Sequence, residues 1–111
     1  MSKLKVFISS PYTIGDQDEN VKVQMDVFNK LYSIGFIPFA PLLFHFQHNI
    51  HPLDYDEWLE IDFAWLDTCD FILRLPGDSI GADKEVKYAK DTGIPTVFTV
   101  DELIKLSKQI S

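Results

Sequence analysis

Short β-rich runs alternate along the chain with longer segments in which apolar residues recur at helical spacing. The runs that predict strands are 3–9, 36–40, 70–75 and 94–100. The segments that predict helices are about 18–34, 54–68, 79–92 and 101–110. In the first helix, Val21, Met25, Phe28 and Tyr32 fall on one stripe, and Gly35 is a natural end. The predicted order of elements is therefore βαβαβαβα.

This order predicts a three-layer α/β sandwich. Strands that alternate with helices form a parallel sheet through right-handed crossovers, with helices on both faces. We expect a small flavodoxin-like or Rossmann-like fold with a four- to five-stranded parallel sheet and a central first strand. At 111 residues, the chain is predicted to form one domain over 1–111. Such sheets bind ligands beyond the carboxyl ends of their strands, where the strand order reverses.

Ligand-binding residues are therefore expected in the segments that follow the first three strands. These segments read SSPYTIGD (9–16), PLLFHF (41–46) and PGDSIGADKE (76–85). The GxGxxG, GxxxxGKS/T and GxSxG motifs are absent from the sequence, which argues against dinucleotide, nucleoside triphosphate and α/β-hydrolase sites. The second segment opens a long apolar stretch, 41–53, which is interpreted as a functional loop.

The third segment leads into a helix with small residues at its start. Asp78 or Ser79 can cap this helix, and Glu85 lies near its amino end. Ser79, Gly81 and Ala82 leave space around that end. Spacing alone leaves two interpretations open. The segment is either an ordinary capped helix, or a pocket floor with an anion site and a carboxylate directed into it.

A second carboxylate lies where an apolar side chain is expected. Asp62 shares a helical stripe with Leu59 and Leu66, so it should face the sheet. A carboxylate in that position is either paired, with Arg74 as the partner, or functional. If Asp62 and Glu85 converge on one crevice, they suit cleavage of a glycosidic bond. One group then protonates the leaving group while the other attacks the anomeric carbon.

Three histidines, His45, His48 and His51, recur at intervals of three residues. A zinc site is one interpretation of this spacing. The prolines at the flanks, Pro41 and Pro52, argue against a regular helix that would align the rings. Histidines that line a pocket or a subunit contact are the favoured interpretation, and no metal site is predicted.

Composition narrows the choice of partner. The formal net charge of −7, from 17 acidic and 10 basic residues, argues against long nucleic acid. Arg74 is the single arginine, so a small anionic ligand would depend on backbone N–H groups, hydroxyls and that one guanidinium. No apolar stretch approaches the roughly 18 residues of a membrane span. The single cysteine, Cys69, fits a reducing compartment, and a cytoplasmic location is expected.

Three blocks of the sequence resemble the nucleoside 2-deoxyribosyltransferase-like superfamily, and within it the small deoxynucleotide N-hydrolases and their bacterial and phage relatives. The blocks are VFISSPYT (6–13), IDFAWLDTCDFIL (61–73) and SIGADKEVKYA (79–89). The resemblance implies that Glu85 is the nucleophile and that Asp62 contacts the sugar and protonates the base. It also implies that Tyr12 supplies an aromatic hydroxyl near the nucleophile.

The same resemblance implies a site for a 5′-phosphate. Ser79 would hold the phosphate together with Ser9 and Ser10 in the first turn. That turn, SSPYTIGD, differs from phosphate-selective hydrolases because it has no basic residue and carries Asp16. Whether a phosphate is required is therefore left open.

The expected function is cleavage of the N-glycosidic bond of a small nucleoside or nucleoside 5′-monophosphate, by hydrolysis or base transfer and without a cofactor. Gly81, Arg74, Phe44 and His45 are expected to line the substrate. A nucleotide sensor without turnover and an NAD glycohydrolase are the alternatives.

A homodimer or higher homo-oligomer is also predicted. The 41–53 segment is unusually apolar, and the helix over 54–68 adds Trp58 and Trp65. Soluble monomers rarely leave so large an apolar patch in water. The resemblance implies that a neighbouring subunit closes the pocket over Glu85.

Overall fold

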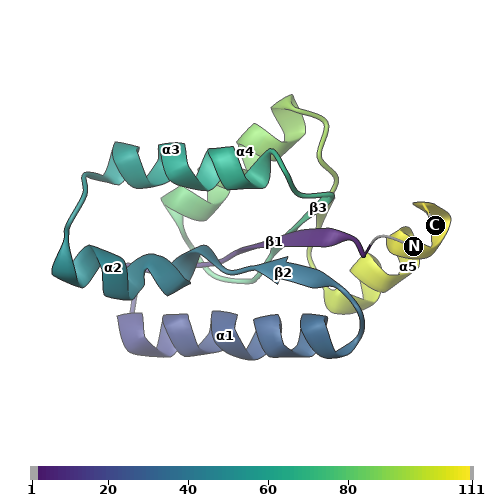
Figure 1. Ribbon diagram of the computed structural model, residues 1–111, viewed down its shortest axis with the longest axis horizontal. Coiled ribbons are helices and arrows are strands. Elements are labelled where there is room, and N and C mark those ends of the chain that lie inside the picture. The colour runs from purple at the N-terminus through teal and green to yellow at the C-terminus, as the bar shows by residue number, and fades with distance from the viewer. Residues whose placement is uncertain (1–2, 111) are drawn as a thin grey trace.

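The structure, a computed structural model, describes residues 3–110 and has a parallel sheet with helices on both faces (Figure 1). The strands are β1 (Lys5–Ser9), β2 (Ile37–Phe39), β3 (Phe71–Arg74) and β4 (Thr96–Val97). The helices are α1 (Gln17–Ser33), the 3-10 turn η1 (Pro41–Leu43), α2 (Phe44–Ile50), α3 (Tyr55–Leu66), α4 (Ile80–Asp91) and α5 (Val100–Ile110). The predicted α/β class and parallel sheet are confirmed, with four strands.

The order of strands across the sheet is β2-β1-β3-β4, so β1 is central as expected. The chain moves outward from β1 to β2 and then returns to the other side of β1 with β3, which makes the carboxyl ends of β1 and β3 the switch point. Ser9 pairs with Arg74 in the register, so these ends are level. Their loops touch, because a Cβ on Gly77 would lie 2.7 Å from Cγ of Pro11.

Alternate residues of each strand enter two separate cores. Val6 and Ile8 of β1 face α1 and α5 in one core. Phe7 faces the other core, which contains Leu66 of α3 and Ala89 of α4. Figure 1 shows α1 on one side of the sheet and α3 with α4 on the other. Because side chains alternate along a strand, the residue two positions after Phe7 also points toward α3 and α4.

Side-chain caps fix where three of the helices begin. Asp16 accepts a hydrogen bond from the first turn of α1, and Ser79 does the same for α4. Asp54 and Glu57 form a reciprocal capping box at the start of α3. The caps satisfy backbone N–H groups that a helix start would otherwise leave unpaired.

The segment 41–53 is not a loop, which corrects the sequence interpretation. Pro41 opens η1, and α2 continues from it to Ile50. The reason is that the two prolines, Pro41 and Pro52, bound the segment instead of interrupting it, and no glycine or proline lies between them. The apolar side chains of this segment are therefore presented by a short helix.

The expected fourth strand is also shorter than predicted. Pairing ends at Val97, and the chain turns into α5. The backbone N–H of Glu102 donates to Oγ1 of Thr99 at 3.1 Å, and the side chain of Glu102 accepts from the N–H of Phe98 at 2.9 Å. These two hydrogen bonds start a helix at the end of the β-rich run TVFTV, and they override the local preference for strand.

Gln24 is a buried polar residue that sequence reasoning missed. The buried face of α1 holds Val21, Gln24 and Leu31, whereas Tyr32 of the predicted stripe is exposed. The side-chain amide of Gln24 donates to the carbonyl of Ile8 at 3.1 Å and to the Ser10 hydroxyl at 2.7 Å. Its carbonyl oxygen accepts from the N–H of Leu42 at 2.9 Å. Gln24 thus ties the end of β1 to η1.

Replacing Gln24 by leucine is expected to lower the free energy of unfolding by about 2–4 kcal/mol, because it leaves buried backbone and hydroxyl groups without partners. Urea unfolding followed by circular dichroism measures the change. Asn29→Leu, an exposed amide on the same helix, is the matched control and should shift the midpoint little. Equal shifts in the two variants would contradict the role given to Gln24.

Candidate functional site

Glu85 is a buried carboxyl group beside the carboxyl end of β1. It lies in the second turn of α4, with 6% of its surface exposed. The hydroxyl of Ser9, the last residue of β1, donates to Oε1 of Glu85 at 2.7 Å. Ser9 lies two positions after Phe7 and is itself fully buried, so it faces α4 across the sheet surface. The contact joins the first strand to the helix that follows the third.

Asp62 of α3 lies beside the carboxyl group of Glu85, and each group influences the ionisation of the other. Its neighbours on the helical stripe, Leu59 and Leu66, are buried as predicted, which turns Asp62 toward α4. Two neighbouring carboxyl groups repel each other when both are ionised, so the pair favours a state in which one of them carries a proton. The structure therefore brings together the two acidic side chains that the sequence singled out.

Burial sets the ionisation of this pair. It raises the pKa of Asp62 to about 6, and the proximity of the Glu85 carboxyl group opposes that rise. Burial, and then the charge of Asp62, raise the pKa of Glu85 well above its usual value. The hydrogen bond from the Ser9 hydroxyl and the charge of Arg74 lower the pKa of Glu85, because both favour its carboxylate form. Carboxyl groups with such opposed influences are typical of functional sites.

Ser9 and Ser10 direct their hydroxyls to opposite faces of the sheet. Ser9 reaches Glu85 on the α4 side, whereas Ser10 accepts from Gln24 on the α1 side. The two side chains point to opposite faces because successive side chains alternate along an extended strand. The two serine hydroxyls predicted to act together in the first turn therefore do not lie in one cradle.

Arg74 pairs with Asp83, not with Asp62. Nη2 of Arg74 lies 3.1 Å from Oδ1 of Asp83 and 2.8 Å from the carbonyl of Gly77, and Nη1 donates to the carbonyl of Leu75. The paired interpretation of Asp62 with Arg74 is therefore wrong. The guanidinium therefore joins the loop between β3 and α4 to the start of α4.

The first turn of α4 combines a cap with an aromatic neighbour. Oγ of Ser79 accepts from the N–H of Ala82 at 3.1 Å, which is the ordinary cap interpretation of that serine. The hydroxyl of Tyr55 lies 3.5 Å from the position of a Cβ on Gly81, so the glycine lets α3 and α4 approach closely. Nζ of Lys84 lies 4.8 Å from the centre of the Tyr55 ring. Sequence reasoning missed both Tyr55 and Lys84.

Aromatic side chains line the side of α3 that carries Asp62. Trp58, one turn before Asp62, stacks on Phe44 of α2 with ring centres 5.2 Å apart. Phe44 also packs against Phe39 at 6.1 Å, and Phe39 stacks on Trp65 at 5.4 Å. Phe44, which was predicted to line the substrate, therefore lies inside an aromatic cluster.

Tyr12, in the segment after β1, and His45, in α2, contact each other. The Tyr12 hydroxyl lies 2.5 Å from Nδ1 of His45, and Nε2 of His45 lies 3.7 Å from a carboxylate oxygen of Asp18. Burial, and then the charge of Asp18, raise the pKa of Tyr12. In this arrangement Tyr12 bonds to the histidine of α2, and its expected position beside Glu85 stays a prediction.

The sequence matches, over residues 4–99, the family model described as "Domain of unknown function (DUF7768)". The chain belongs to the DUF7768 family. No curated protein matches the sequence. Among solved structures, this DUF7768 chain is similar to the 2-deoxyribosyltransferase of the psychrotolerant bacterium Bacillus psychrosaccharolyticus, with a TM-score of 0.56 and 20% identity. The similarity covers 83% of this chain and 69% of that chain, and it shows a deoxyribosyltransferase-like fold.

Two of the three histidines of the DUF7768 chain, His45 and His48, form hydrogen bonds with other residues. Nδ1 of His48 accepts from Nε1 of Trp58 at 2.7 Å and from the N–H of Leu53 at 3.3 Å. His45 bonds to Tyr12. Over residues 3–110, histidine, cysteine and acidic side chains form no group of three that could hold a metal ion. The same stretch of chain contains no helix long and apolar enough to cross a membrane.

Proposed function

We propose that this DUF7768 protein cleaves the N-glycosidic bond of a small nucleoside or nucleoside 5′-monophosphate. The observation that supports this proposal is the pair of neighbouring, largely buried carboxyl groups, Asp62 and Glu85, at the switch point. Inverting glycosidases keep their carboxyl groups roughly 6.5–9.5 Å apart to hold a water between them, whereas retaining glycosidases keep them about 5–5.5 Å apart and use one as a nucleophile. The close pairing of Asp62 and Glu85 favours the covalent, retaining route.

In the proposed mechanism, Glu85 acts as the nucleophile. Its carboxylate attacks C1′ of the sugar, and the bond from C1′ to the base nitrogen breaks. Asp62 delivers its proton to the departing base, which leaves neutral. Water, or a second base, then attacks C1′ and releases the Glu85 carboxylate, while Asp62 takes up the proton of the attacking group.

Attack on C1′ requires that Glu85 is ionised and that Asp62 carries the proton. Burial raises the pKa of both groups, so the pair keeps a proton at a pH where separate carboxyl groups would have lost it. Positive charge that develops on the sugar favours a Glu85 carboxylate, which the Ser9 hydroxyl also stabilises. Both influences favour the proton on Asp62 during the attack.

The surrounding residues supply contacts for the two ends of a nucleoside. Phe44 and Trp58, stacked on each other beside Asp62, offer aromatic surface for the base. The amino end of α4 at Ser79 and Gly81 offers backbone N–H groups, and Lys84 offers a positive charge close by. This end would accept a 5′-hydroxyl or a 5′-phosphate.

Chromatographic detection of free base after incubation with nucleosides, nucleoside 5′-monophosphates and NAD tests the proposal. Release of base from one of the first two classes is the expected result. Release of nicotinamide alone would instead assign an NAD glycohydrolase. Binding without release of any base would point to a sensor and would contradict the proposal.

We also propose that the protein forms a homodimer through α2. Leu43, Phe46 and Ile50 lie along one side of η1 and α2 at helical spacing, and at least half of each side chain is exposed. An apolar stripe of this kind is typical of a subunit contact.

Light scattering at micromolar concentration should therefore give twice the 12.8 kDa of one chain. Phe46→Glu should shift the mass toward one chain, because it introduces a charge into the apolar stripe. Gln47→Glu, at the neighbouring exposed position, is the control and should keep the dimer. A mass of one chain for the unmodified protein would contradict the dimer.

A further inference from the structure

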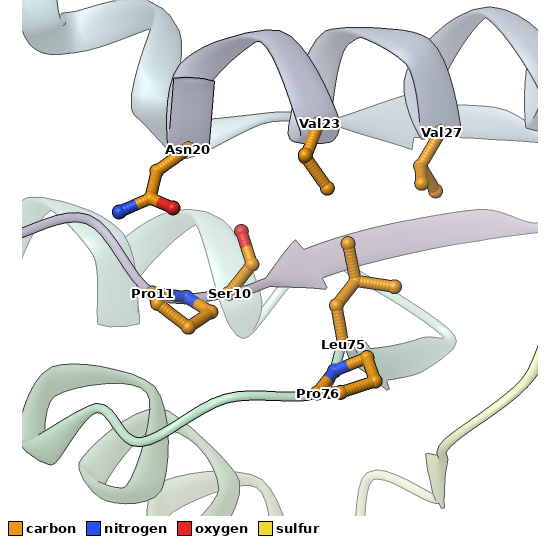
Figure 2. Close-up of a pocket in the computed structure, with 7 residues that line it drawn as sticks. All are labelled: Ser10, Pro11, Asn20, Val23, Val27, Leu75 and Pro76. Atoms are coloured by element: carbon orange, nitrogen blue, oxygen red, sulfur yellow. The ribbon is translucent and has the colours of Figure 1, made fainter. Parts of the chain in front are cut away.

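A hollow of about 340 Å³ lies on the α1 face of the sheet, on the opposite side from Glu85. Its walls come from residues 20–27 of α1 and from the loops that follow β1 and β3 (Figure 2). The lining residues are Ser10, Pro11, Asn20, Val23, Val27, Leu75 and Pro76. The volume is at the lower end of the roughly 300–1,000 Å³ typical of ligand sites, so it suits one small ring system.

Two polar atoms in this hollow have fixed hydrogen-bonding roles. The side-chain N–H groups of Asn20 donate to the carbonyls of Tyr12 at 3.1 Å and Ile14 at 2.8 Å. Because both partners are acceptors, the amide cannot be reversed, and its oxygen is left to face the hollow as an acceptor. Figure 2 shows this oxygen directed to the gap between α1 and the Ser10 segment.

Ser10 supplies the complementary donor. The orientation of the Gln24 side-chain amide is fixed, because its carbonyl oxygen accepts from the N–H of Leu42. Its amide N–H therefore points to the Ser10 oxygen at 2.7 Å, and that oxygen is the acceptor in the contact. The hydroxyl proton of Ser10 has no acceptor among the hydrogen bonds of residues 3–110 and is free to donate into the hollow.

The rest of the lining selects for a flat, neutral and apolar molecule. Pro11, Leu75 and Pro76 lie across from Val23 and Val27, and no charged side chain lines the hollow. Val23 is 43% exposed, so apolar surface is available to a ligand. A net charge of −7 on the chain disfavours an anion there.

We propose that this hollow binds a small, neutral, planar nitrogen heterocycle that carries an N–H donor beside a C=O acceptor. The ring N–H donates to the Asn20 oxygen, and the ring carbonyl accepts from the Ser10 hydroxyl. The five apolar residues cover the two faces of the ring. This site is separate from the carboxyl pair and does not depend on the function proposed for that pair.

Titration of the ¹⁵N- and methyl-labelled protein with uracil, followed by two-dimensional NMR, tests the site. Uracil should shift the Asn20 side-chain amide and the Val23 and Val27 methyl signals. 1,3-Dimethyluracil has the same ring without an N–H donor and should bind at least about tenfold more weakly. This ligand comparison needs no variant, so it stands even if a substitution perturbs folding.

Three variants locate the site within the molecule. Val23→Trp fills the hollow and should weaken uracil binding at least about tenfold, whereas Asn29→Trp, exposed on the same helix, should not change it. Glu85→Gln should also leave uracil binding unchanged, even if it abolishes catalysis. Three results would overturn the proposal: no shifts at millimolar uracil, shifts centred on Asp62 and Glu85, or equal binding of the dimethylated ring.

Discussion

Glu85→Gln is expected to lower the rate of base release at least about 100-fold, which is the lower range for loss of a catalytic side chain. Glutamine has nearly the shape of glutamic acid, and its amide oxygen can still accept the hydrogen bond from Ser9. It lacks the carboxylate that attacks C1′ in the proposed mechanism, so no covalent intermediate would form. Chromatographic measurement of free base over time gives the rate, and substrate binding should remain nearly intact.

A second acid-to-amide variant on the same helix makes the comparison specific. Asp83→Asn changes an exposed acid whose partner is Arg74, and it should keep most of the activity. Circular dichroism of both variants controls for folding. Turnover by Glu85→Gln close to that of the unmodified protein would remove the proposed mechanism. A folded but inactive Glu85→Gln together with an active Asp83→Asn would support it.

The carboxyl pair is also expected to make the protein less stable as pH rises. The pKa of Asp62 is raised from 3.8 to about 6 in the folded chain. Between these values the folded state binds more protons than the unfolded state, so the unfolding free energy falls with increasing pH. The stability that protonated Asp62 contributes is fully present below about pH 4 and is lost as pH rises through about 6. By linkage, the loss is about 2–3 kcal/mol.

Asp62→Asn isolates this contribution. The variant cannot titrate at this position, so it should not lose this part of its stability as pH rises. The unfolding free energy of the variant minus that of the unmodified protein should therefore be about 2 kcal/mol larger at pH 7 than at pH 4. Urea unfolding at both pH values measures the change. Glu60→Gln alters an exposed acid on the same helix and provides the control for general charge effects. A difference between Asp62→Asn and the unmodified protein that is the same at both pH values would contradict the buried pair.

A gain in stability at neutral pH would carry information about function. A structural ion pair is expected to lose stability when one partner is removed. By contrast, a protein with two neighbouring buried carboxyl groups is expected to become more stable when one of them is replaced. The replacement removes the cost of burying a charge and the repulsion between the two groups. Asp62→Asn that is both more stable at pH 7 and less active would mark the pair as a functional site maintained at a cost to the fold.

The periodicity of the sequence was enough to predict the layered fold. Apolar runs predicted the strands, and the helical stripe through Leu59 and Leu66 predicted the orientation of α3. These signals are local, since a helix or strand repeats its own contacts every few residues. The errors arose where local signals conflict. Pro41 and Pro52 looked like marks of a loop but bound a helix, and Thr99 with Glu102 begins a helix inside a β-rich run.

The sequence also singled out Asp62 and Glu85 through a polar residue on an apolar stripe and a carboxylate after a small-residue turn. The same signal marks Gln24, which stands on the stripe of α1 between Val21 and Leu31. Buried polar residues on helical stripes are therefore informative in this protein, whether they act in binding or hold the backbone. Their partners, however, could not be predicted from spacing.

By itself, then, the sequence determined the order of elements, the parallel sheet and the identity of the two unusual carboxyl groups. Only the tertiary structure decided which groups meet. Ser9 and Glu85 are 76 positions apart, and Arg74 turned out to pair with Asp83 instead of Asp62. The position of Ser9 and Ser10 on opposite faces likewise decides that one hydroxyl contacts Glu85 and the other contacts Gln24. The physical reason is that propensity and periodicity act over a few residues, whereas burial, proton sharing and ion pairing depend on which distant surfaces pack together.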